Sequence, residues 1–289
     1  FLREGAAIGD FMRPDRVVLG LESPRAESAL RALYRPLNLI EVPMVVTGLE
    51  TAELIKYAGN AFLATKVSFI NEIANLCETV GADVQDVARG IGLDGRIGRK
   101  FLHAGPGYGG SCFPKDTLAL VRIAEEAGLP LRIVQAAVAA NDAQRGRMVQ
   151  KIRRALGGSE AGRTIGVLGL TFKPETDDMR DAPALAILPQ LVDRGARIVA
   201  HDPQGMAEAR HLLPPDITYA PTAFDVATGA DAVVLLTEWN EYRNLDLAAL
   251  RARMTGDTLV DLRNVYSPAA ATAAGLRYVG VGRGRDAGA

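Results

Sequence analysis

The stretch Thr164-Ile165-Gly166-Val167-Leu168-Gly169-Leu170 is a short apolar run that decides the fold class. Three similar runs follow it, at residues 196–200, 232–236 and 258–261, and helical stretches separate them. A strand-helix-strand order of this kind is typical of a parallel sheet with crossover helices. We therefore predict an α/β chain whose C-terminal part is a parallel sheet that binds its ligands at the carboxyl ends of the strands.

Basic side chains follow two of the predicted strands. Lys173 and Arg180 come after the first run, and Arg263 comes after the fourth. Because the forked guanidinium of arginine pairs well with phosphate, we expect these side chains to face an anionic ligand, although each taken alone fits a surface charge. No predicted strand is followed by the Gly-x-Gly-x-x-Gly fingerprint of a dinucleotide site, and we interpret residues 280–284 as a loose tail.

A composition break at residues 157–162, Gly-Gly-Ser-Glu-Ala-Gly, predicts a domain boundary, and the chain before it has helical periodicity. Thr47 and Glu50 have the spacing of a capping box and predict the start of a long helix that ends at Gly81. Apolar positions cover more than one narrow stripe of this helix, so we expect it to be largely buried, as a connecting spine or as a dimer core. Shorter helices are predicted at residues 83–90, 117–127 and 132–156.

Lys56 and Asn60 lie one turn apart on one face of the long predicted helix. Most lysines are solvated surface residues, and that interpretation applies to Lys56 as well. A partly buried lysine near a reacting carbonyl would instead have its pKa lowered by desolvation and would be a candidate acid, base or oxyanion partner.

The glycine-rich loop at residues 105–111, Gly-Pro-Gly-Tyr-Gly-Gly-Ser, leads directly into Cys112, with Lys115 and Asp116 shortly after it. A thiol at a helix start beside a cation has the setting that lowers a cysteine pKa and makes a nucleophilic thiolate. The alternative is a small buried cysteine in a loop whose glycines only turn the chain. Cys77 lies in a helical pattern without a neighbouring glycine or cation, and we interpret it as a packing residue.

The first residues predict one strand-helix unit, with a strand at residues 16–21 and a helix at about 24–34 capped by Ser23. Parallel strands are normally covered on both sides, and this strand has no predicted neighbour upstream. We therefore expect the unit to be the last piece of a larger α/β domain.

The charge balance of the chain indicates which classes of binding partner to expect. The net charge of −1 over 289 residues gives no general attraction to nucleic acid or to a membrane surface, so small molecules or other subunits are the expected partners. No run of about eighteen apolar residues predicts a membrane span. Two cysteines in dissimilar settings do not make a disulfide framework, and they suit a reducing cytoplasm.

With these motifs in place, the chain resembles the nucleotide-sugar dehydrogenases, the UDP-glucose/GDP-mannose dehydrogenase family. The resemblance is carried by Phe-Leu-Arg-Glu-Gly at residues 1–5, Ala-Glu-Leu-Ile-Lys-Tyr-Ala-Gly-Asn-Ala-Phe at 52–62, Gly-Gly-Ser-Cys-Phe-Pro-Lys-Asp at 109–116, Gly-Leu-Thr-Phe-Lys at 169–173, Thr-Glu-Trp-Asn at 237–240 and Asp-Leu-Arg-Asn at 261–264. It implies the remnant of an N-terminal NAD-binding Rossmann domain (1–43), a central helical dimerisation domain with the cysteine loop (44–156) and a C-terminal Rossmann-like domain that holds the UDP-sugar (157–289).

The resemblance also implies an activity, the NAD-dependent four-electron oxidation of the sugar C6 hydroxyl to a carboxylate. Cys112 would attack the aldehyde, Lys56 and Asn60 would stabilise the oxyanion or move the proton, and Asp116 would orient water. Substrate contacts are implied for Phe1, Leu2, Arg3, Glu4, Lys56, Asn60, Arg96, His103, Ala104, Gly105, Pro106, Gly107, Tyr108, Gly109, Lys173 and Arg263, with Arg96 reaching the site of the neighbouring subunit. Contacts with NAD are implied for Glu4, for residues 112–115 including Cys112 and Lys115, and for Arg180.

The chain departs from the family pattern at its beginning. The glycine fingerprint of the NAD domain and the Pro-Glu pair that precedes Phe-Leu in the family have no counterpart in the sequence. We therefore expect this chain, taken alone, to bind NAD poorly.

Two alternatives remain open. GDP-mannose and UDP-N-acetylmannosamine dehydrogenases share the cysteine chemistry, although Phe113 and the motifs at 237–240 and 261–266 look more like the UDP-glucose branch. A different class of protein is a non-catalytic module that binds a nucleotide sugar and dimerises.

Overall fold

The computed structural model describes residues 2, 5–37 and 42–284. They form two compact units, Phe1–Phe62 and Leu63–Ala289, called here the N-terminal and C-terminal units. The α/β class with parallel sheets and a long helix, as predicted, is confirmed.

The N-terminal unit contains a two-stranded parallel sheet, β1 (Val17–Gly20) and β2 (Met44–Thr47), with helix α2 (Pro24–Tyr34) in the crossover. The side chain of Ser23 accepts a hydrogen bond from the amide of Ala26 at 3.2 Å, as expected of an N-cap. Helix α1 (Ala7–Met12), a short 3-10 turn (Arg35–Leu37) and residues 49–62 of the long helix also belong to this unit. The first strand and helix are therefore confirmed, but β1 does have a partner strand that the sequence did not reveal.

The predicted capping box at Thr47 is wrong. Thr47 is the last residue of β2, where it pairs with Gly20, and its carbonyl accepts the amide of Leu21. Helix α3 therefore begins at Leu49 and runs without interruption to Val80. It ends at Gly81, which has a φ of +79° in the left-handed region that favours glycine, so the predicted end is confirmed.

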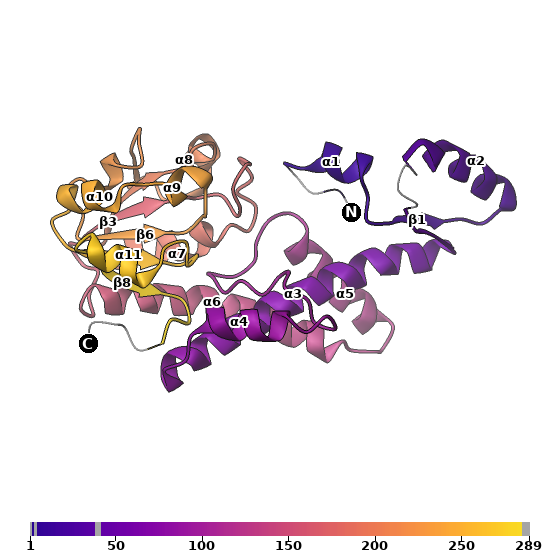
Figure 1. Ribbon diagram of the computed structural model, residues 1–289, viewed down its shortest axis with the longest axis horizontal. Coiled ribbons are helices and arrows are strands. Elements are labelled where there is room, and N and C mark those ends of the chain that lie inside the picture. The colour runs from indigo at the N-terminus through magenta and orange to yellow at the C-terminus, as the bar shows by residue number, and fades with distance from the viewer. Residues whose placement is uncertain (1, 3–4, 38–41, 285–289) are drawn as a thin grey trace. The chain divides into compact units, whose positions relative to one another are not determined.

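Three further helices form the helical part of the C-terminal unit: α4 (Val84–Gly92), α5 (Phe113–Glu126) and α6 (Arg132–Ala155). Helix α5 begins four residues before the predicted start at 117, because Pro114 fits the first turn, where its missing N–H is not needed. Helix α6 runs along α3, and the hydroxyl of Ser68 on α3 donates to the carbonyl of Ala137 on α6 at 2.7 Å (Figure 1).

The rest of the C-terminal unit is built on a six-stranded sheet with the order β5-β4-β3-β6-β7-β8, in which all neighbours are parallel. The strands are β3 (Thr164–Leu168), β4 (Arg197–His201), β5 (Thr218–Tyr219), β6 (Ala232–Leu235), β7 (Thr258–Asp261) and β8 (Arg277–Gly280). This is the doubly wound Rossmann order. The four predicted strands are confirmed. Strands β5 and β8 were not predicted: β5 has only two residues, and β8 begins with the exposed Arg277 and ends in the glycine-rich residues that were interpreted as a tail.

The sheet is covered on both faces, as a parallel sheet requires. Ile165 and Val167 face a core shared with α3, α6 and α7 (Pro183–Asp193), whereas Leu168 and Val233 face a second core with α10 (Leu247–Arg253) and α11 (Pro268–Ala273). Helices α8 (Met206–Leu212) and α9 (Asn240–Arg243) lie in the connections between strands (Figure 1).

Residues 280–284 are not the loose tail that the sequence suggested. Gly280 ends β8, and Val281 is fully buried. The amide of Gly282 donates to the carboxylate of Glu78 on α3 at 2.7 Å, and Arg283 pairs with Asp83 at 3.1 Å. The glycine at 282 does not indicate a loose segment here. Gly282 has a φ of +68°, which favours glycine, and it packs closely on Ala74 and Val84.

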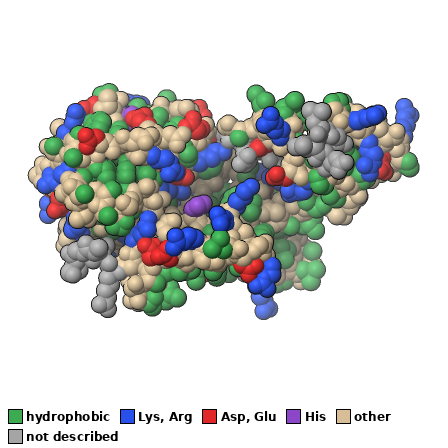
Figure 2. All heavy atoms as spheres, in the orientation of Figure 1, with side chains coloured by type: hydrophobic (Ala, Val, Ile, Leu, Met, Phe, Trp, Pro, Cys, Tyr) green, Lys and Arg blue, Asp and Glu red, His purple; other side chains and the backbone are tan. Residues whose placement is uncertain are grey.

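Acidic and basic side chains are interspersed over the visible face of the sheet domain, in keeping with the small net charge (Figure 2). Among the described residues, every helix is too short or too polar to cross a lipid bilayer.

Candidate active site

The carboxyl edge of the sheet brings together three loops. The strand order reverses between β3 and β6, and in doubly wound folds ligands bind at this switch point. The loop at 169–182 follows β3 and carries Lys173 and Arg180, the loop at 236–239 follows β6, and Arg263 follows β7.

The fully buried side chain of Asp202, just after β4, holds two of these loops. One carboxylate oxygen, Oδ2, accepts the amides of Leu170 and Thr171 at 2.7 and 3.1 Å and the indole N–H of Trp239 at 3.2 Å. The other, Oδ1, accepts the amide of Gly205 at 2.7 Å. Because buried N–H groups need acceptors, this carboxylate fixes the exit of β3 against the exit of β6.

Arg263 is placed at this edge, but much of its guanidinium already has protein partners. Its Nε donates to the carbonyl of Leu236 at 2.7 Å, and its Nη2 donates to the carbonyl of Phe172 at 3.1 Å. Glu238 forms an ion pair with the same Nε at 3.0 Å. Arg263 therefore ties the loops after β3, β6 and β7 together, which leaves fewer of its donors for a phosphate than the sequence suggested.

Lys173 and Arg180 lie on the loop after β3 with exposed or half-buried side chains. The ammonium of Lys173 lies 5.0 Å from the centre of the Phe172 ring. The guanidinium of Arg180 is held in a two-bond pair by the buried carboxylate of Asp178, at 2.8 and 2.9 Å. Asp178 was not predicted from the sequence, and it presents Arg180 to solvent in a fixed orientation.

Cys112 lies immediately before the first turn of α5, and its side chain is exposed. Its sulfur lies 3.6 Å from the hydroxyl of Ser111. Lys115 forms an ion pair at 2.6 Å with Asp116, whose carboxylate is buried whereas the lysine is exposed. Cys77 is buried in the core between α3 and α6, where burial raises the pKa of its thiol, so its predicted packing role is confirmed.

The cysteine loop is packed directly against the loop after β3. The amide of Gly110 donates to the carbonyl of Arg180 at 2.8 Å. A Cβ on Gly109 would come within 2.1 Å of the carbonyl oxygen of Asp181, and one on Gly110 would come within 2.5 Å of the Phe172 ring. Gly109 and Gly110, just before Cys112, therefore allow the two loops to approach this closely, because a larger residue at either position would collide with the loop after β3.

Polar side chains of α3 and α6 hold the other side of the cysteine loop. Asn71 accepts the amide of Gly105 at 2.8 Å, Asn141 accepts the amide of Tyr108 at 2.8 Å, and Gln144 donates to the carbonyl of Gly105 at 2.9 Å. Sequence reasoning missed these residues. The available signal was that Asn141 and Gln144 share the buried face of α6 with Ala137 and Met148, where a polar side chain needs a partner.

The remaining predicted substrate residues have mixed positions. The stretch Ala104–Tyr108 is buried, whereas the neighbouring His103 is exposed, and burial raises the pKa of the Tyr108 phenol. Arg96 is held by Asp94 in a pair at 2.5 Å, with 89% of the arginine side chain exposed. This hydrogen-bonded pair lowers the pKa of Asp94.

Lys56 and Asn60 lie in the N-terminal unit, where the ammonium of Lys56 donates to the amide oxygen of Asn60 at 3.4 Å. Their predicted position on one face of α3 is confirmed. Leu2 is exposed, and Phe1, Arg3 and Glu4 lie outside the described residues.

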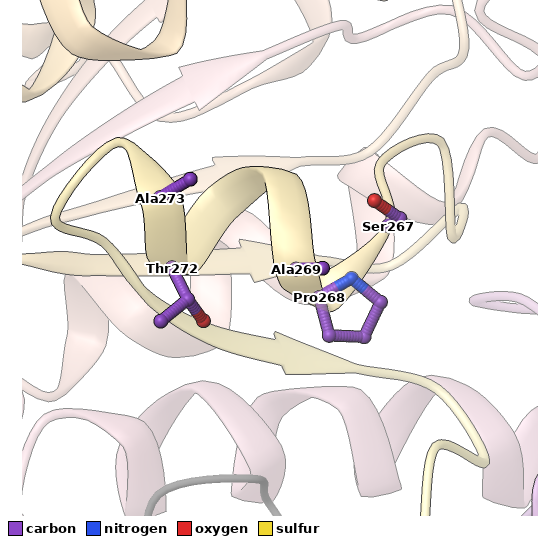
Figure 3. Close-up of a pocket in the computed structure, with 5 residues that line it drawn as sticks. All are labelled: Ser267, Pro268, Ala269, Thr272 and Ala273. Atoms are coloured by element: carbon purple, nitrogen blue, oxygen red, sulfur yellow. The ribbon is translucent and has the colours of Figure 1, made fainter.

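A surface hollow beside α11 is separate from this chemistry. It is lined by Ser267, Pro268, Ala269, Thr272 and Ala273, which are small and uncharged (Figure 3). Within residues 2, 5–37 and 42–284, no group of three or more His, Cys, Asp or Glu side chains is arranged to hold a metal ion.

In comparison with known proteins, two segments of the chain match models of protein families. Residues 50–143 match the central domain of the UDP-glucose/GDP-mannose dehydrogenase family, and residues 166–268 match its UDP-binding domain. The chain is 56% identical over 285 residues to a UDP-glucose 6-dehydrogenase of Rhizobium meliloti, covering 98% of this chain and 65% of that protein. It is 47% identical over 283 residues to UDP-glucose 6-dehydrogenase TuaD of Bacillus subtilis, covering 98% of this chain and 60% of that protein.

A solved structure shares the fold. A UDP-glucose dehydrogenase from Pyrobaculum islandicum superposes with a TM-score of 0.87 at 41% identity, covering 98% of this chain and 62% of that chain. The chain thus spans less than two thirds of the length of the relatives described above.

Proposed function

Because this chain belongs to the UDP-glucose/GDP-mannose dehydrogenase family, we propose that it carries the nucleotide-sugar site and the thiol of a UDP-glucose 6-dehydrogenase. The observation that carries the proposal is the exposed thiol of Cys112 at the start of α5, on a loop packed against the exit of β3. In the domain division proposed here, residues 1–43 belong to the NAD domain, 44–156 to the helical domain and 157–289 to the UDP-sugar domain.

In this proposal the nucleotide sugar binds along the carboxyl edge of the sheet. Lys173 supplies positive charge at the loop after β3, and the backbone of residues 103–109 faces the sugar. The guanidinium of Arg263, anchored to two carbonyls, shapes this edge and contributes positive charge to it. Phe1, Leu2, Arg3 and Glu4 are proposed as further contacts on the strength of the family motif.

The thiol chemistry follows from the position of Cys112. Its thiolate adds to the carbonyl carbon of the C6 aldehyde and forms a thiohemiacetal, whose oxidised form is a thioester. Water then hydrolyses the thioester to the carboxylate and releases the thiol. Lys56 and Asn60 stabilise the oxyanion, and Asp116 orients the water.

NAD, when bound, takes up the electrons of both oxidations. The residues present fit a dinucleotide on this side of the site, because Asp178 holds the guanidinium of Arg180 in a fixed, solvent-facing position suited to a phosphate. Residues 112–115 at the start of α5 provide the second contact, with Lys115 exposed. Glu4 is proposed as a third.

We also propose a homodimer built on α3. Phe62, Phe69 and Leu76 are exposed at intervals of seven residues, which is the spacing of a helix that packs lengthwise against another helix. In the dimer, the exposed Arg96 completes the site of the partner subunit. The two free cysteines agree with the reducing cytoplasm as the proposed location.

A second candidate is a nucleotide-sugar-binding module without dehydrogenase activity. It is favoured by the match of residues 166–268 to the family's UDP-binding domain, a match that concerns nucleotide binding and not the oxidation step. A GDP-mannose or UDP-N-acetylmannosamine substrate is the alternative within the family.

Calorimetric titration of this chain with UDP-glucose, GDP-mannose and NAD tests the proposal. We expect UDP-glucose to bind, GDP-mannose to bind much more weakly and NAD to bind poorly. Adding the Rossmann domain of a relative in front of the chain should then restore NADH formation from UDP-glucose. Binding without turnover in that fusion would favour the non-catalytic module, and no binding of any nucleotide sugar would contradict both.

A further inference from the structure

Arg145 on α6 links the two loops that meet at the candidate site. Its Nη2 group donates to the carbonyl oxygen of Tyr108, on the cysteine loop, at 3.1 Å. The same Nη2 donates to the carbonyl oxygen of Asp181, on the loop after β3, also at 3.1 Å. A single guanidinium nitrogen therefore holds two backbone segments that lie more than seventy residues apart in the sequence.

The helix that carries Arg145 is itself fixed to the cysteine loop. Asn141, one turn earlier on α6, accepts the amide of Tyr108 at 2.8 Å and donates to the carbonyl of Tyr108 at 3.2 Å. Gln144 donates to the carbonyl of Gly105 and is held in turn by Asn75 of α3 at 3.0 Å. The guanidinium of Arg145 thus projects from a rigid platform, and a charged donor makes stronger hydrogen bonds to carbonyls than a neutral one.

The two loops also carry the residues that the proposed reaction needs together. One leads into Cys112, and the other carries Lys173 and Arg180. In their direct contact the amide of Gly110 is bonded to the carbonyl of Arg180, and the Phe172 ring lies against Gly110. On the cysteine loop, Gly109 and Gly110 bring no side chain to this contact, so a cross-link from α6 helps to set how the loops are aligned.

We propose that Arg145 is a positioning residue that aligns the nucleophile loop with the loop after β3. This inference rests on the proposed function for its purpose, but the alignment itself is a property of the chain without ligand.

Hydrogen–deuterium exchange of the unliganded chain tests the alignment. In Arg145→Gln we expect amide exchange to rise about tenfold in peptides covering both residues 105–112 and 172–182, because a charge-assisted bond to each loop is lost. Arg147→Gln is the matched control, since Arg147 is an exposed residue of the same helix. Arg145→Lys, which keeps the charge and much of the reach, should restore most of the protection.

The affinity for UDP-glucose provides the functional readout. We expect Arg145→Gln to weaken binding about tenfold or more while the melting temperature stays near that of Arg147→Gln, and Arg145→Lys to recover most of the affinity. Faster exchange spread over α6 and the sheet, or loops that stay protected in Arg145→Gln, would overturn the proposal. If the unaltered chain binds no nucleotide sugar but the two loops loosen as described, the positioning role stands and the proposed function fails.

Discussion

Gly109 and Asp181 approach so closely that the backbone of one occupies the place where a side chain of the other would begin. A Cβ built on Gly109 would lie 2.1 Å from the carbonyl oxygen of Asp181. The Asp181 carbonyl also accepts a hydrogen bond from Arg145, so it is not free to move aside. This contact explains why the chain before Cys112 needs a glycine at this position.

Gly109→Ala should therefore separate the two loops. We expect a lower melting temperature and the loss of UDP-glucose binding, measured by differential scanning fluorimetry and calorimetry. Gly146→Ala on α6 is the control, because a Cβ there meets nothing within 4 Å. Alanine in a helix is more favourable than glycine by roughly 0.5–1 kcal/mol, so the control should melt slightly higher. Equal melting temperatures for the two variants would contradict the structural argument.

The two thiols should differ sharply in reactivity. Cys112 is exposed, and Cys77 is buried with 3% of its surface accessible. In the native chain we expect Ellman's reagent to titrate a single thiol quickly, and the second only after denaturant is added. Cys112→Ser should remove the fast phase, whereas a fast phase that persists in this variant would show that Cys77 is accessible.

Asp202→Asn should destabilise the C-terminal unit. The one oxygen of the amide can still accept from Leu170, Thr171 and Trp239, but its NH2 group would then face the amide N–H donors of Gln204 and Gly205. A buried donor without an acceptor costs roughly 1–3 kcal/mol, so we expect a loss of about 3 kcal/mol in the free energy of unfolding, measured in urea. Asp177→Asn is the control, since Asp177 is exposed. Similar unfolding midpoints for both variants would be the contrary result.

His201 should make the fold less stable in mild acid. Burial lowers the pKa of this imidazole from its ordinary value of 6.5, although Glu241 and Asp202 oppose the shift. Below pH 6.5 the unfolded chain therefore binds more protons than the folded chain, and stability falls as the pH falls towards the lowered pKa. We expect His201→Gln to flatten the loss of stability between about pH 7 and pH 5 in urea titrations. An unchanged slope would mean that other groups cause it.

Charge placed on the exposed stripe of α3 should break the proposed dimer. In Phe69→Glu combined with Leu76→Glu, we expect light scattering to give half the mass of the unaltered chain, because both side chains are about half exposed and lie two turns apart. Leu212→Glu on α8 changes an equally exposed leucine away from α3 and should leave the mass unchanged. A monomeric unaltered chain would contradict the dimer directly.

Periodic apolar runs made much of the fold predictable. The long helix, its end at Gly81 and the four central strands follow from patterns that a few neighbouring residues create. Strand β2 and the burial of Val281 could not be read in this way, because each depends on a distant partner: β2 pairs with β1, and the residues around Val281 bond to Glu78 and Asp83.

In the candidate site, too, residues in local motifs were predictable, and residues that depend on distant contacts were not. Cys112, Lys173 and Arg180 follow local motifs, and the structure places them on adjoining loops. Asp202 and Asn141 carry no motif, because their role is to satisfy backbone groups that only the folded chain brings near them. For Arg263 the sequence predicted the position after a strand correctly. Its hydrogen bonds to two carbonyls depend on loops that meet only in the folded chain, so they could not be predicted.

Trp239 is the single tryptophan of the chain, and its indole is 3% exposed with its N–H on Asp202. Intrinsic tryptophan emission is thus an optical probe of the sheet's carboxyl edge. It belongs to the C-terminal unit, so a fluorescence melt records the loss of that unit, and opening of residues 1–62 is silent in it. Circular dichroism, which averages over all helices, would record both, and the separation between the two curves measures how independently the two units unfold.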